Sequence, residues 1–115
     1  MTIEQLIIKA IDKCAENADE EQKRVYCWMK AALKYPDIEK FITEIKSATQ
    51  GFGKVSIETM HNACEFAASY NEWLIRNMSI TDKEKEEKIT SEKIRLKEVE
   101  VRMSGVLQYF GLLKV

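Results

Sequence analysis

Glycine, proline and histidine are scarce in this sequence of 115 residues, which contains four Gly, one Pro and one His. So little glycine and proline excludes collagen-like, linker-like and turn-dense β architectures. A single histidine restricts acid–base chemistry, and the sequence contains no phosphate-binding, dinucleotide-binding, nucleophile-elbow or zinc-protease motif. The acidic residues fall mostly on polar helix faces beside cationic neighbours. We therefore expect neither enzyme activity nor a cofactor.

An excess of charge of one sign is also missing, because 18 Lys and Arg oppose 19 Asp and Glu. This balance provides no global field that would steer the protein toward DNA or an anionic membrane. The sequence has three cysteines, an odd number, and a secreted disulfide scaffold of this size would have a larger, even set. No apolar run reaches the length of a membrane span. We expect a cytoplasmic protein with reduced thiols and no membrane contact.

Helical periodicity is present along most of the chain. Its apolar residues recur at helical spacing in five segments, at about 2–17, 20–34, 36–48, 56–77 and 82–110. Asp19, Ser56 and Thr81 precede three of these segments as N-caps, and Pro36 suits the first turn of another. The length fits one domain, 1–115. The sequence thus predicts an all-α bundle of four or five helices.

Two of the predicted helices are long. The segment 56–77 carries three heptads of apolar spacing and a wide apolar arc, so we expect it at the centre of the bundle. The C-terminal helix begins with a charged, solvated segment at 82–88. As a continuous helix, 82–110 would extend beyond a compact domain of this size.

The C-terminal region allows a second interpretation. Apolar residues between Ile94 and Met103 also alternate as in a strand, so a β-hairpin at 94–113 competes with the helix. Ion-pair spacings such as Glu98 and Arg102, and the lack of a turn signal between the apolar runs, favour the helix.

Several residues indicate a second packing surface. Asn71 is a polar residue within the apolar stripe of 56–77, where coiled coils place residues that set register and partner number. An equal alternative is an asparagine that is hydrogen-bonded inside a monomer. Ile94 and Val101 lie opposite the main stripe of the C-terminal helix, and Ile75 and Ile80 exceed what a one-sided core needs. These five residues are the predicted interface, and a larger monomeric core is the competing explanation.

The segment 20–34 has a basic face, formed by Lys23, Arg24, Lys30 and Lys34. Basic neighbours lower a thiol pKa, which makes Cys27 the candidate reactive thiol, although an ordinary exposed cysteine is the simpler reading. The same face, or the segment 53–62, could contact nucleic acid. Acidic residues on both segments argue against this.

His61 and Cys64 have a spacing that two metal ligands on one helix can use. Without a second ligand pair at close spacing, we expect no metal site there.

Absent catalytic motifs and surplus apolar stripes lead to one functional prediction. We expect a non-catalytic protein-binding module, with coiled-coil-like packing, that acts as an adaptor or stoichiometric inhibitor and forms a homodimer. The alternatives are a nucleic-acid-binding regulator and a thiol-based redox sensor or small enzyme that uses Cys27.

Overall fold

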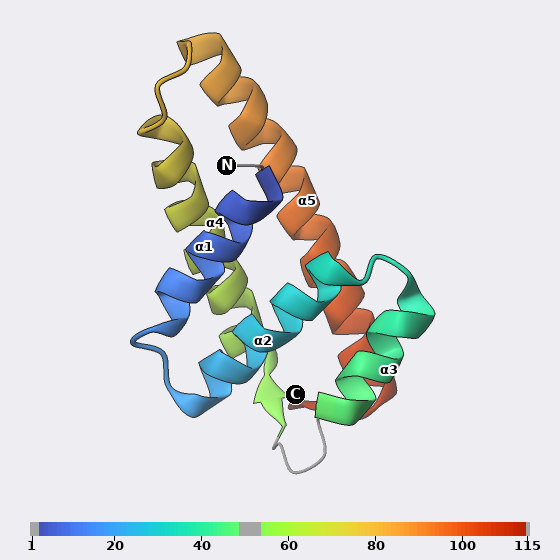
Figure 1. Cartoon of the computed structure of the whole chain (residues 1–115). Helices are drawn as coiled ribbons and strands as arrows, with labels where there is room; N and C mark the ends of the chain where they lie inside the picture. Colours follow the sequence, from blue (N-terminus) through green and yellow to red (C-terminus); the bar gives the residue numbers. More distant parts are fainter. Residues whose placement is uncertain (1–2, 49–53, 115) are drawn as a thin grey trace.

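The computed structural model describes the backbone of residues 3–48 and 54–114, and the side chains of residues 5–46 and 54–114. The described chain forms α1 (Ile3–Ala15), α2 (Glu20–Lys34), α3 (Ile38–Ala48), α4 (Ile57–Arg76) and α5 (Asp82–Tyr109). Two short strands, β1 (Val55–Ser56) and β2 (Leu113–Lys114), pair in parallel next to the start of α4. The predicted all-α bundle is therefore confirmed (Figure 1).

The competing β-hairpin at 94–113 is wrong, because residues 94–109 belong to one helix. A helical face lets Leu96, Val99, Met103 and Leu107 enter the same core, and all four are buried. A strand would have placed Leu96 on the face opposite Val99, Met103 and Leu107.

Local capping sets the starts of three helices as predicted. The Asp19 side chain accepts a hydrogen bond from the Gln22 backbone N–H at 2.8 Å, and the Gln22 side chain accepts one from the Asp19 N–H. The Ser56 and Thr81 hydroxyls accept from the N–H groups of Thr59 and Glu84. Each cap satisfies donors that have no partner inside the helix.

Helices α4 and α5 form an antiparallel pair that runs the length of the molecule, and α1 and α2 cross it (Figure 1). Helix α4 contacts α1, α2 and α5, which is the central position that its wide apolar arc predicts. Helix α5 has 28 residues, and the longest dimension of the molecule is 45 Å. A straight helix of this length spans about 42 Å, so α5 alone accounts for most of that dimension.

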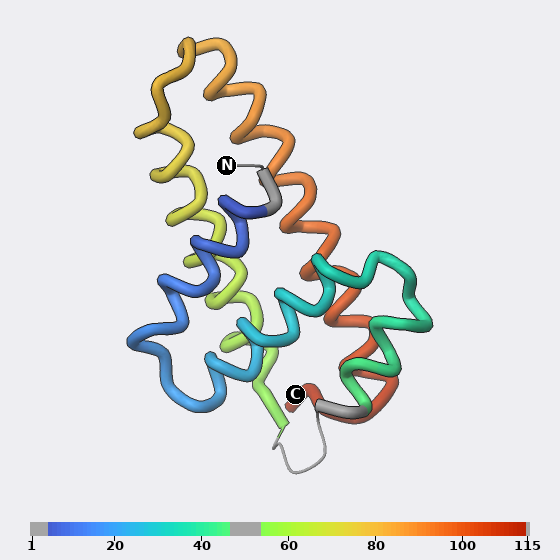
Figure 2. Tube along the Cα trace, in the orientation of Figure 1, coloured from blue at the N-terminus to red at the C-terminus, as the bar shows by residue number. Residues whose placement is uncertain are grey.

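The described residues form two buried hydrophobic clusters. The main core contains residues from all five helices and both strands, including Trp28, Met29, Phe41 and Met103. A smaller cluster, formed by Leu6, Ile75 and Ile89, lies nearer the turn between α4 and α5. Leu6 of α1 packs there against Ile75 of α4 and Ile89 of α5, and the traces of these two long helices converge on that turn (Figure 2).

Candidate functional site

The outer face of α5 carries large apolar side chains that the chain itself does not cover. Ile94 is 58% exposed, Val101 is 62% exposed and Tyr109 is also exposed. Glu98 and Gly105 lie between them, at the spacing of one helical strip. We call Ile94, Glu98, Val101, Gly105 and Tyr109 the outer strip.

Helix α3 extends the outer strip at its C-terminal end. Ile38 of α3 is exposed, and with Ile42 it lines a shallow groove against Val101, Gly105 and Tyr109. A second groove runs along the strip itself, and Lys97 and Arg102 lie at its edges. The apolar surface of α5 thus continues onto a neighbouring element, with charged side chains around it.

The five predicted interface residues occupy different environments. Ile94 and Val101 are exposed on α5, and Ile80 is half-buried in the turn that precedes α5. Asn71 is only 2% exposed and Ile75 only 1% exposed. The assignment of Asn71 and Ile75 to a surface between chains is therefore corrected. The apolar stripe of α4 faces α1 and α5 of the same chain, because α4 is the central helix.

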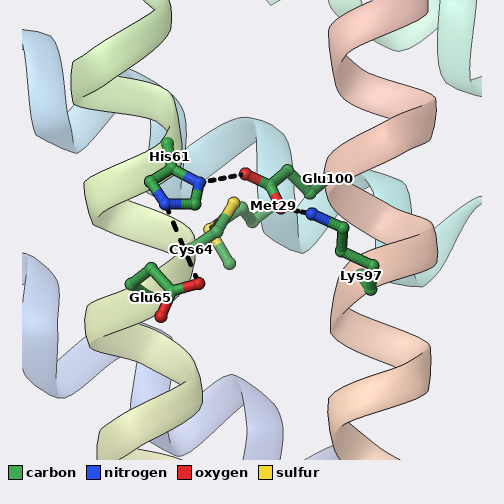
Figure 3. Close-up of polar contacts among 6 residues, drawn as sticks. All are labelled: Met29, His61, Cys64, Glu65, Lys97 and Glu100. Atoms are coloured by element: carbon green, nitrogen blue, oxygen red, sulfur yellow. Dashed lines mark hydrogen bonds and ion pairs between the residues drawn. The ribbon is translucent and has the colours of Figure 1, made fainter.

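A polar cluster lies between α4 and α5 (Figure 3). The His61 Nδ1–H donates to Glu100 Oε1 at 3.0 Å, and Lys97 Nζ donates to Glu100 Oε2 at 3.2 Å. Glu100 is buried, so these two donors compensate a carboxylate that would be costly to bury alone. The other ring nitrogen of His61 lies 4.0 Å from Glu65.

Cys64 lies behind this cluster but is poorly suited to be a nucleophile. Its Sγ atom is 4.0 Å from the Met29 sulfur, inside the core. Burial, together with the charges of Glu100 and Glu65, raises the pKa of the Cys64 thiol to about 12. At neutral pH the thiolate that nucleophilic chemistry requires is therefore almost unpopulated.

Two acidic residues are buried in α5, which the sequence analysis did not predict. Glu92 and Glu100 are both buried, whereas the sequence predicts that acidic residues lie mostly on solvent-facing helix surfaces. A helical projection places both residues beside apolar neighbours on α5. The projection therefore predicts the burial of both glutamates, but it does not show which partner compensates each charge.

The predicted basic face on α2 is less uniform than its sequence indicates. Lys23 is exposed, whereas Lys30 Nζ contacts Asp12 at 2.8 Å and Lys34 Nζ lies over the Tyr35 ring. Arg24 is half-buried, and its Nη1 atom is buried without a hydrogen-bond partner in the described part of the chain. Two of the four cations are thus engaged by neighbours.

The second segment proposed for nucleic-acid binding is tied to the body of the protein. Residue 53 lies outside the described residues, and the described part begins at Lys54. Val55 is fully buried, and the Ser56 N–H donates to Glu21 Oε1 at 2.6 Å. Both nucleic-acid assignments remain untested predictions.

Cys27 is the exposed cysteine, Cys14 is half-buried and Cys64 is buried. Cys27 lines a shallow groove with Lys30, Lys34 and Glu44. Its setting therefore includes an acidic side chain from α3 as well as the predicted basic neighbours.

Within residues 5–46 and 54–114, no three His, Cys, Asp or Glu side chains are grouped so that they could hold a metal ion. His61 and Cys64 instead contact Glu100 and Met29 respectively. Among the described helices, none is both long enough and apolar enough to cross a bilayer. Comparisons with protein-family models, curated proteins and solved structures find no match to this chain.

Proposed function

We propose that this chain is a non-catalytic, cytosolic protein-binding module, an adaptor or stoichiometric inhibitor that binds through the outer strip of α5. The observation that carries the proposal is the exposure of Ile94 and Val101 on a helix whose opposite face already fills the core. More than half of each of these two side chains is exposed, so most of their apolar surface is open to a partner.

The chemistry of this surface supports a protein partner. It combines the aliphatic side chains of Ile94 and Val101 and the aromatic ring of Tyr109 with Lys97 and Arg102 at the edges, and Glu98 lies within the strip. An apolar centre with a polar rim is typical of protein interfaces. Fully burying an exposed aliphatic side chain contributes about 1.5–3 kcal/mol, and Ile94 and Val101 each have more than half of that burial to gain, so together they contribute part of a micromolar affinity.

The test is affinity capture from the native host with three immobilised proteins. They are the unmodified chain, the double variant Ile94→Lys/Val101→Lys, and the control Asn62→Lys/Ser69→Lys. The control adds the same charge at the same spacing to exposed positions on α4. We expect mass spectrometry to find proteins retained by the unmodified chain and the control but lost from the α5 variant. Identical sets on all three would contradict the proposal.

A further inference from the structure

We propose that the outer strip of α5 binds a second copy of this chain, in an antiparallel arrangement about a two-fold axis near residues 99 and 100. This inference rests on the proposed function, because it identifies the partner of the same surface. The structural basis is the order of large, charged and small residues along the strip.

An antiparallel two-fold pair places the two ends of the strip opposite each other. In the heptad layering of antiparallel helices, Ile94 of one copy faces Gly105 of the other, and Glu98 faces Val101. A Cβ atom built on Gly105 would meet nothing within 4 Å in its own chain, so Gly105 is an open notch on the surface. The exposed Ile94 side chain is the complementary projection.

The placement of Glu98 favours the antiparallel arrangement over the parallel one. In the antiparallel pair, Glu98 of one copy lies within one helical turn of Arg102 of the other. The Arg102 Nη1 donates to the Ala32 carbonyl at 3.0 Å, and the side chain still lines the groove beside Val101. A parallel pair would set Glu98 against Glu98 and Lys97 against Arg102, and both contacts repel.

The size of the strip sets the expected affinity. From Ile94 to Tyr109 it spans about 22 Å of helix, roughly four turns. Two helices that pack over this length bury less area than a standard interface, which places the dimer among weak ones. We therefore expect a dissociation constant in the micromolar range.

The test exchanges the large side chain at position 94 and the open position at 105. Analytical ultracentrifugation at protein concentrations from about 1 µM to about 500 µM covers a dimer dissociation constant in the micromolar range. We compare the unmodified chain with Gly105→Leu, Ile94→Ala and the double variant Ile94→Ala/Gly105→Leu. Both positions are exposed, so circular dichroism should show that every variant is folded.

We expect the unmodified chain to dimerise and Gly105→Leu to weaken the dimer about tenfold or more, because the notch is filled. The double variant should recover to within about threefold of the unmodified chain, since residue 94 of one copy faces residue 105 of the other. A double variant no better than Gly105→Leu would overturn the antiparallel arrangement.

A chain that stays monomeric throughout this range would overturn the second copy as the occupant. If capture still depended on Ile94 and Val101, the protein-binding function would stand with a different partner. Conversely, a dimer with the expected compensation, but no captured protein that depends on these residues, would support this inference and remove the adaptor or inhibitor function.

Discussion

Glu92 is the residue at which burial and ionisation conflict most clearly. Its side chain is 3% exposed, and its Oε2 atom has no hydrogen-bond partner in the described part of the chain. Burial raises the pKa of the Glu92 carboxyl above its ordinary value of 4.5, although the charges of Arg95 and Lys88 act in the opposite direction. The folded state therefore favours the protonated carboxyl.

This conflict predicts a pH-dependent effect of Glu92→Gln. An acid with a raised folded-state pKa contributes stability that is present below about pH 4.5 and lost as the pH rises through the folded pKa. Relative to the unmodified chain, Glu92→Gln should therefore become more stable as the pH rises above about 4.5. Urea unfolding at several pH values measures this difference. Glu87→Gln, at an exposed position on α5, is the control, and parallel behaviour of the two variants would contradict the assignment.

The three cysteines provide a second residue-scale prediction. Cys27 is exposed, whereas burial raises the pKa values of the Cys14 and Cys64 thiols. We expect iodoacetamide to label Cys27 first and Cys64 last in the folded protein, as mass spectrometry of timed samples would show. In urea the three rates should converge. Equal rates in the folded protein would contradict this order.

At the scale of single elements, α2 depends on the reciprocal cap between Asp19 and Gln22. Replacing Asp19 with Ala leaves the Gln22 N–H without its side-chain acceptor, which should cost about 1 kcal/mol of unfolding free energy. Urea denaturation measures this loss. Asp19→Ser, which keeps an acceptor, should lose much less, and equal losses in the two variants would rule out capping as the cause.

Helix α5 shows how local sequence decided an ambiguous segment. The alternation around Ile94 and Val101 fits a strand, but the residues of α5 that fill the core recur at three and four. Burying that set on one face requires a helix, and Ile94 and Val101 then lie on the opposite face. The exposure that makes the outer strip a candidate interface follows from this choice.

At the scale of the whole molecule, the described residues form two hydrophobic clusters of unequal size, so the stability should not be uniform along the chain. Residues 82–87 are exposed or half-buried, whereas residues 96–107 contribute to the main core. We expect amide hydrogen exchange to be fastest in the first turns of α5 and slowest in 96–107. Uniform protection along α5 would contradict this division.

The same division predicts the effect of Leu6→Ala. Leu6 joins α1 to Ile75 and Ile89 in the smaller cluster, so its truncation should cost about 2–3 kcal/mol. Faster exchange should be confined to α1 and to the parts of α4 and α5 that contact this cluster. Phe66→Ala, at an exposed position on α4, is the control and should change neither exchange nor stability appreciably.

The sequence by itself determined the helices and the outer face of α5. Periodicity and capping involve residues three or four positions apart, so they can be read without knowing the fold. The same periodicity places Ile94 and Val101 opposite the main stripe of α5 without knowledge of the fold.

Only the tertiary structure decided which faces are covered and which polar groups meet. Asn71 and Ile75 are buried because α4 is surrounded by other helices of the same chain. His61 and Glu100 are 39 positions apart, and their contact depends on the register between α4 and α5. A helical projection gives the direction of a side chain about its own axis, but long-range packing determines what that side chain meets.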